Sequence, residues 1–162
     1  DETLARINRG HDFAAFRRAV EMTRRRGIHI CAHLILGLPG ETAEMMLRSA
    51  EIIGQMGLDG IKLHLLYVVK GTGLDALYQK GGYTCLEMDE YADRVCDVLE
   101  RLPQTTVIQR LTGDPHPAEL RAPLWALDKK ASMTAITARL EARDCWQGKA
   151  LGLPRPVDFR RT

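Results

Sequence analysis

The chain has 162 residues, 45% of them hydrophobic, which is enough for one compact domain with a buried core. Its formal net charge of +2 is too small to indicate a nucleic-acid-binding protein on its own. No apolar run approaches the roughly 18–20 residues of a membrane-spanning helix, so we expect a soluble chain without a membrane partner.

The cysteines are widely spaced. The closest two of the four are 11 positions apart, and no pair has the spacing of a zinc site, a redox pair or a cluster-binding loop. We therefore expect reduced, mostly buried cytoplasmic thiols, and no metal ligands in this chain.

Apolar spacing predicts four helical segments and three strands in alternation. Helices are indicated where apolar residues recur every three or four positions, and strands where short apolar runs stand between turn residues. The predicted elements are a helix over 11–26, a strand over 28–36, a helix over 43–56, a strand over 60–69, a helix over 86–102, a strand over 105–111 and a helical segment over 124–143.

This order of elements predicts the fold class. Alternating helices and strands with short connections are typical of right-handed β-α units with a parallel sheet. Three strands are few for a free-standing sheet of this kind, so we expect the second half of a barrel. Ligands of such folds lie outside the carboxyl ends of the strands, which here are residues 36–41, 66–73 and 109–116.

The turn after the first predicted strand, "GLPGET", has two interpretations. A phosphate-binding loop would need a longer spacing and a lysine after its second glycine, and neither is present. The residues favour a structural turn in which Gly37 ends the strand, Pro39 and Gly40 form the turn and Thr42 caps the next helix.

Two histidines lie inside neighbouring predicted strands. In a strand, residues two positions apart point to the same face, so His33 lies on one face with Ile35, and His64 lies on one face with Lys62. A histidine in a strand is more often a hydrogen-bonded core residue than a ligand. Two of them on adjacent strands nevertheless favour a polar lumen.

Three further groups of polar residues leave alternatives open. The arginines at 24–26 either complement a helix carboxyl end or bind nucleic acid. The segment "RLTGDPH" gathers Arg110, Asp114 and His116 either in a simple turn or in a site. Lys70 is either a solvated loop lysine or a catalytic amine.

Four segments, in order, resemble a known family. These are "INRGHDFAAFRRAVEMTRRRGIHICAHLILGLPGET", "DGIKLHLLYVVKGTGL", "VIQRLTGD" and "APLWALDK". They are similar to radical S-adenosylmethionine (SAM) barrels, and most of all to the YhcC-type branch, which is related to the catalytic subunit of Elongator. The resemblance implies an α/β fold, the C-terminal half of a partial (β/α)6 barrel with parallel strands, over residues 1–116. We expect a C-terminal helical extension over 117–148 and an extended or disordered tail over 149–162.

The resemblance also implies a chemistry and a set of site residues. In this family a [4Fe–4S] cluster binds and reductively cleaves S-adenosylmethionine, and the resulting 5′-deoxyadenosyl radical abstracts hydrogen from a substrate. By position, the resemblance implies that Arg9 approaches the cofactor and that His33 faces its polar part. Ile35 would contact the adenine ring, and so would the backbone of Tyr67 and Val68. Candidates for the substrate side are His64, Lys70, Gln109 and Arg110.

One departure from the family is clear. The family holds its cluster with a C-x3-C-x2-C loop after the first strand, and this chain has no such triplet. We therefore expect a fragment of a longer enzyme, inactive alone, whose partner is the missing N-terminal half. Its open sheet edge predicts self-association, and the relation to Elongator makes transfer RNA a further candidate partner.

The residues leave two other functions open. One is a non-enzymatic α/β module that binds nucleic acid, such as transfer RNA, through the Arg-rich helix end and tail. The other is an ordinary barrel enzyme that forms a Schiff base on Lys70. Neither the substrate nor any catalytic residue is predicted.

Overall fold

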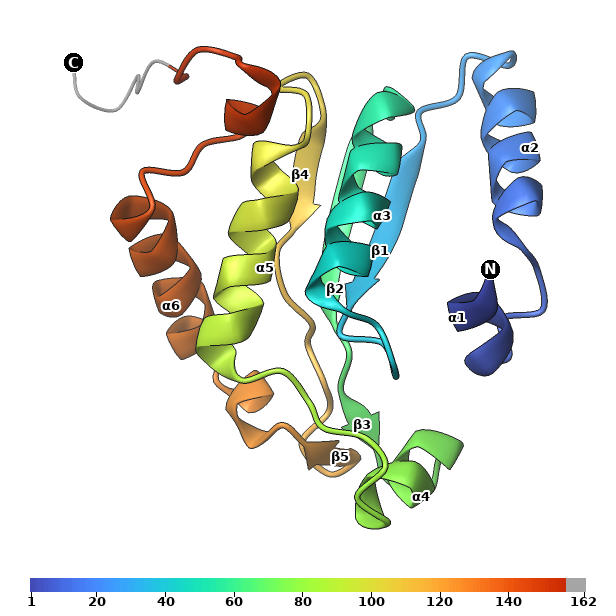
Figure 1. Cartoon of the computed structure of the whole chain (residues 1–162), viewed down its shortest axis with the longest axis vertical. Coiled ribbons are helices and arrows are strands. Elements are labelled where there is room, and N and C mark those ends of the chain that lie inside the picture. Colours follow the sequence, from blue (N-terminus) through green and yellow to red (C-terminus); the bar gives the residue numbers. More distant parts are fainter. Residues whose placement is uncertain (157–162) are drawn as a thin grey trace.

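A parallel sheet of three strands forms the centre of the computed structural model, which describes residues 1–156 (Figure 1). The strands lie in the order β1–β2–β4 and comprise Cys31–Leu36, Gly60–Leu65 and Val107–Arg110 respectively. Both pairs are parallel, and Leu36 at the end of β1 lies opposite Leu65 at the end of β2. The predicted α/β fold with parallel strands is confirmed.

The longer helices cover one face of this sheet. In Figure 1, α3 and α5 lie in front of the strands, α6 lies beside α5, and α2 lies beyond the β1 edge. The α-helices are α1 (Glu2–Arg6), α2 (Phe13–Arg24), α3 (Ala43–Gln55), α4 (Gly73–Gln79), α5 (Met88–Glu100) and α6 (Lys129–Ala142). Two 3₁₀-helices, η1 (Leu124–Leu127) and η2 (Lys149–Leu151), flank α6.

Alternation along the strands separates a covered face from an open one. Leu36, Ile61, Leu63 and Leu65 are buried and pack with apolar residues of α3 and α5 in the main core. The residues between them point to the other face, because successive side chains of a strand alternate. The second face of the sheet is therefore not covered by the helices.

The predicted strand over 60–69 is wrong in its second half. β2 ends at Leu65, and after two residues the chain forms β3 (Val68–Val69), which pairs antiparallel with β5 (Leu120–Ala122). Nothing in the apolar run "LHLLYVV" marks this break. The residues remain apolar across the break, but the strand partner changes: β2 pairs with β1 and β4, whereas β3 pairs with β5, about fifty residues further along the chain.

Helix α4 was not predicted, because the elements expected from the sequence leave residues 70–85 as a connection. Thr72 caps α4 by accepting a hydrogen bond from the backbone N–H of Asp75 at 3.2 Å. The spacing T-x-x-D is a helix-start signal that would have indicated this helix. Asp75 in turn accepts hydrogen bonds from the N–H of Gly71 and from Arg121, both at 2.9 Å, and so fastens α4 to β5.

The C-terminal part is partly helical where a tail was expected. The predicted helical segment over 124–143 divides into η1 and α6, with Asp128 capping α6. Lys149–Leu151 form η2, next to Trp146, whose ring N–H donates to the carbonyl of Leu153 at 2.9 Å. Residues 157–162 of the expected tail lie outside the described residues, and the domain limits at 116 and 148 stay predictions.

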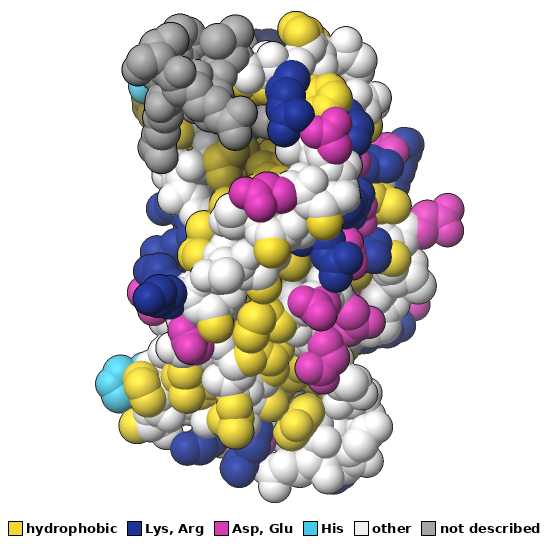
Figure 2. All heavy atoms as spheres, turned by 90° about the vertical axis from the view of Figure 1, so that its left-hand side faces the viewer, with side chains coloured by type: hydrophobic (Ala, Val, Ile, Leu, Met, Phe, Trp, Pro, Cys, Tyr) yellow, Lys and Arg dark blue, Asp and Glu magenta, His cyan; other side chains and the backbone are white. Residues whose placement is uncertain are grey.

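Apolar side chains are exposed on the side that carries α6. Figure 2 shows hydrophobic side chains gathered over the lower half of this side. Leu124 and Leu127 of η1 and Met133 of α6 are exposed. If the chain associates with another one, as we predict, this surface and the free edges of β1 and β4 are available to it.

Within residues 1–156, the structure contains no helix that is both long enough and apolar enough to cross a membrane.

Candidate functional site

The open face of the sheet carries a row of polar side chains across all three strands. β1 contributes His33 and the exposed Ile35, and β2 contributes Lys62 and His64. Arg110 of β4 lies opposite Lys62 in the register of the sheet. The predicted polar lumen thus corresponds to this face, which the helices leave uncovered.

The two histidines are in contact. Their rings are stacked with centroids 5.3 Å apart and an angle of 23° between the planes. Ile35 lies opposite His64 in the register of β1 and β2, so an apolar side chain adjoins the stacked pair. The prediction that the two histidines are neighbours in the sheet is therefore correct.

The surroundings of His64 favour its neutral form, because they lower its pKa. Burial lowers its pKa, and the positive charge of Arg110, with smaller effects of His33 and Lys62, lowers it further. Its Nε2 atom is buried and has no hydrogen-bond partner among the described residues. A buried polar atom without a partner is costly, so His64 presents an unused hydrogen-bonding group on this face.

Gln109 joins this face from β4. The position that a Cβ on Gly60 would occupy lies 2.9 Å from Gln109 Nε2 and 3.6 Å from the Sγ of Cys31. A side chain at position 60 would push the end of the Gln109 side chain aside. Gln109 therefore extends the row on the side of the amino ends of the strands.

Tyr67 and Val68 lie where the chain leaves β2 for β3. The Tyr67 ring packs over Gly113, where an added Cβ would lie 3.1 Å from Cε1 of the ring. Val68 is fully buried and pairs with Ala122, so its side chain is not available to a ligand. A backbone contact of either residue with a cofactor stays a prediction.

The remaining predicted residues, Arg9 and Lys70, form no hydrogen bond or ion pair with the row among the described residues. Arg9 is exposed in the connection between α1 and α2. Lys70 donates from Nζ to the carbonyl of Ala118 at 2.9 Å, and its N–H donates to Glu119 at 2.8 Å. Lys70 thus links the segment after β3 to the one before β5.

The turn "GLPGET" is structural. Gly37 has a φ of +88°, its carbonyl accepts a hydrogen bond from the Tyr83 hydroxyl at 2.7 Å, and a Cβ here would lie 3.1 Å from Leu86. Thr42 accepts from the N–H of Met45 and caps α3, as predicted.

Glu41 in the same turn was not singled out from the sequence. It accepts a hydrogen bond from the Leu38 N–H at 3.2 Å, and burial raises its pKa above the usual range. The single acidic residue in "GLPGET" is the only signal in the sequence that pointed to it. Lys62 was noted only as the alternation partner of His64, although it lies in the row.

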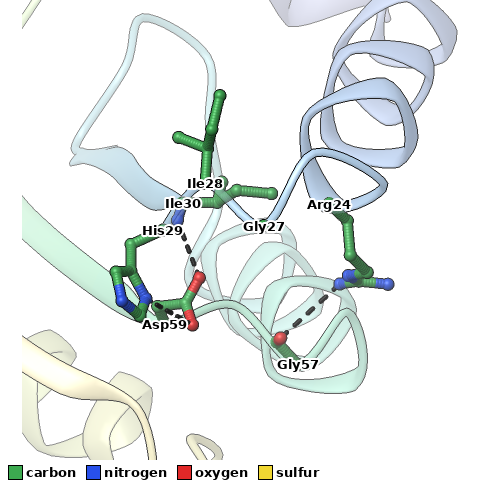
Figure 3. A pocket seen from close by; sticks show the side chains of 7 residues that line it. All are labelled: Arg24, Gly27, Ile28, His29, Ile30, Gly57 and Asp59. Carbon is green, nitrogen blue, oxygen red and sulfur yellow. Dashed lines mark hydrogen bonds and ion pairs between the residues drawn. The ribbon is translucent and has the colours of Figure 1, made fainter.

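A hollow of about 240 Å³ lies at the other end of the sheet, before the amino ends of β1 and β2 (Figure 3). There Asp59 accepts from the Ile30 N–H at 2.7 Å and lies 3.2 Å from Nδ1 of His29, and these contacts lower its pKa. Arg24 donates to the carbonyls of Met56 and Gly57 at the end of α3. This hollow is away from the carboxyl ends of the strands, and its polar groups join elements of the fold.

These contacts favour the structural interpretation of the arginines at 24–26. Arg24 satisfies carbonyls at the end of α3, and Arg26 donates to the Met22 carbonyl of its own helix at 2.6 Å. Asp114 of "RLTGDPH" forms an ion pair with Lys129 at 3.3 Å. A nucleic-acid-binding role stays a prediction.

The described residues do not provide a metal centre. Among residues 1–156, no three His, Cys, Asp or Glu side chains are placed to hold a metal ion. All four cysteines are free, and only Cys31 is not buried. An iron–sulfur cluster therefore has no fitting ligand set in this part of the chain.

Comparison with known proteins identifies the family. Residues 58–142 match the Radical_SAM C-terminal domain. YtqA of Bacillus subtilis (strain 168) is 40% identical over 150 residues, which are 92% of this chain and 46% of the relative. YhcC of Escherichia coli (strain K12) is 36% identical over 154 residues, which are 95% of this chain and 50% of the relative. The chain thus spans about half the length of these relatives.

The fold also has a solved counterpart. The archaeal Elp3 of Methanocaldococcus infernus, with its N-terminus deleted, superposes with a TM-score of 0.76 over 90% of this chain and 34% of its own. At 18% identity this likeness is one of fold. Because the family match covers more than half of its residues, the chain belongs to the radical SAM family, as a Radical_SAM C-terminal domain.

Proposed function

We propose that this chain forms one wall of the S-adenosylmethionine site of a radical SAM enzyme located in the cytoplasm. The observation that carries the proposal is the stacked pair of His33 and His64 beside Ile35 on the open face of the sheet. It combines an exposed apolar side chain with polar groups at one place, as cofactor sites do.

The side chains on this face fit the cofactor. Ile35 offers an apolar surface for adenine, and the exposed His33 lies next to it for the polar part of the cofactor. His64 stacks on His33 and so supports the His33 ring beside Ile35, while its own ring nitrogen is left for the substrate side. When bound together with an iron–sulfur cluster, S-adenosylmethionine supplies a 5′-deoxyadenosyl radical, which removes a hydrogen atom from the substrate.

The cluster would be held by another segment. The described residues lack a set of metal ligands, and the relatives are about twice as long as the part that matches. We therefore place the cluster in an N-terminal half that completes the barrel against β1. The role of the present chain is to bind and orient the cofactor and to keep water from it.

Binding of S-adenosylmethionine to this chain, measured by equilibrium dialysis, tests the proposal. Ile35→Asp and His33→Ala should each weaken binding about tenfold or more. Ile35→Asp would bury a charge against adenine, and His33→Ala would remove a polar contact with the cofactor. Ile28→Asp and His29→Ala are matched controls, since both residues are exposed at the opposite end of the sheet. Equal affinities of all four variants would refute the site.

Activity needs a second experiment. The longer protein that the proposal requires, reconstituted with iron and sulfide and reduced, should release 5′-deoxyadenosine from S-adenosylmethionine. His33→Ala in that protein should lower the yield at limiting cofactor. A reconstituted protein that carries the cluster but forms no 5′-deoxyadenosine would contradict the proposed chemistry.

A further inference from the structure

We propose that Lys62, His64 and Arg110 bind an anionic group of the substrate, a phosphate or a carboxylate. The proposal rests on the proposed function in one respect: the anion is a substrate group only if the chain is part of an enzyme. The anion site itself follows from the arrangement of these three side chains.

The three groups lie on the same face of two neighbouring strands. Lys62 and Arg110 are opposite each other in the register of β2 and β4. His64 follows two positions after Lys62 on the same face of β2, and the charges of both Lys62 and Arg110 act on it. Two cations and an imidazole with a free nitrogen thus share one small area.

No acidic residue of the three strands balances this charge. β1, β2 and β4 contain no Asp or Glu. In the part of the chain that the structure describes, none of the three side chains takes part in an ion pair or a side-chain hydrogen bond. The acids nearest in sequence to these strands have other partners: Asp59 pairs with His29, Glu41 with the Leu38 N–H, and Asp114 with Lys129.

This arrangement suits an anion and disfavours a cation. A guanidinium binds a carboxylate or a phosphate through two parallel hydrogen bonds, and an ammonium adds a point charge. A divalent metal would be repelled by Lys62 and Arg110. It would also find only His33 and His64 as ligands, since no third one is placed among residues 1–156.

His64 would report the binding of an anion. The charged or titratable groups that face it are Arg110 from β4, His33 from β1 and Lys62 from β2 itself, and none of them is an acid. A bound anion would stabilise the imidazolium form and raise the pKa of His64. The histidine ring signals in an NMR spectrum therefore give a readout that does not depend on enzymatic activity.

The experiment titrates inorganic phosphate, and separately acetate, into the chain at constant ionic strength. We expect saturable shifts of the His33 and His64 ring signals and a higher pKa of His64 with anion bound. His29, at the amino end of the sheet, should not respond. Arg110→Gln should weaken phosphate binding about tenfold or more, and Arg17→Gln, at an exposed position of α2, should not change it.

Lys62→Gln provides a second variant, which keeps most of the side-chain length and removes the charge. The proposal is overturned if phosphate causes no saturable shift at His64. It is also overturned if Arg110→Gln and Lys62→Gln both bind phosphate as tightly as Arg17→Gln. Arg110 is exposed, so its substitution does not endanger the fold.

A competition experiment separates the substrate from the cofactor. If the anion belongs to the substrate, phosphate binds equally well in the presence of saturating S-adenosylmethionine. Displacement of phosphate by S-adenosylmethionine, but not by its decarboxylated form, would assign the site to the cofactor carboxylate and overturn the proposal. If phosphate binds at His64 while S-adenosylmethionine does not bind at all, the proposed function fails and the anion site stands.

Discussion

Gly54 in α3 provides a sharp test of the packing between the helices. Ala50 and Gly54 are small buried residues one turn apart on α3, at the place where this helix approaches α5. A Cβ on Gly54 would lie 2.3 Å from the carbonyl oxygen of Arg101, at the end of α5. That oxygen belongs to the backbone, so it cannot move away unless the two helices separate.

We expect Gly54→Ala to destabilise the protein, whereas the same substitution in an exposed helix stabilises it. In an exposed helix, replacing Gly by Ala stabilises by about 1 kcal/mol. At Gly54 this gain is exceeded by overpacking, which typically costs about 1–3 kcal/mol and is near its upper end when backbone atoms collide. We expect Gly54→Ala to lower the free energy of unfolding by about 1–2 kcal/mol, or Tm by about 2–8 °C for a chain of this length.

Gly73→Ala is the matched control. Gly73 is the first residue of α4, and an added Cβ there would have no neighbour within 4 Å. This variant should be as stable as the wild type or gain up to about 1 kcal/mol. Urea unfolding followed by circular dichroism gives both values. A Gly54→Ala variant as stable as Gly73→Ala would refute the close approach of α3 and α5.

Two further predictions concern buried polar contacts. Arg121 and the Gly71 N–H hold the pKa of Asp75 below its usual range, so its contribution to stability is present above about pH 4 and is lost as the pH falls through the lowered pKa. Asp75→Asn should therefore flatten the acid side of a plot of unfolding free energy against pH, and an unchanged slope would contradict this. The hydroxyl of the buried Tyr91 donates to the carbonyl of Leu111 at 2.8 Å, so Tyr91→Phe should lower the free energy of unfolding by about 1 kcal/mol. A urea midpoint equal to that of the wild type would contradict the bond.

Local signals predicted the first β-α unit well. The apolar run after Gly27, the glycine and proline of the turn and the capping hydroxyl of Thr42 act over a few residues. They predicted the end of β1 and the start of α3 correctly, although β1 begins only at Cys31. The contact between His33 and His64 was also predictable. Two strands joined by one helix are neighbours in a parallel sheet, so side chains on their common face meet.

The rest of the site depends on contacts that are distant in sequence. The register that places Arg110 opposite Lys62 includes an irregularity, so counting along β4 does not predict it. Helix α4 is fastened by Asp75 and Arg121, which are 46 positions apart. The role of Arg24 likewise depends on the end of α3, since its guanidinium reaches the carbonyls of Met56 and Gly57.

The sequence by itself determined the order of the three parallel strands and of the helices α2, α3, α5 and α6 around them, the structural nature of the turn "GLPGET", and the face that His33 and Ile35 share. These follow from the periods of helices and strands and from turn and cap residues, which act locally. Only the tertiary structure decided where β2 ends and β3 begins. It also decided which cations meet around His64 and that no acid of the three strands neutralises them. Pairing partners and unbalanced charge are properties of segments far apart in the chain, and they exist only when the sheet has formed.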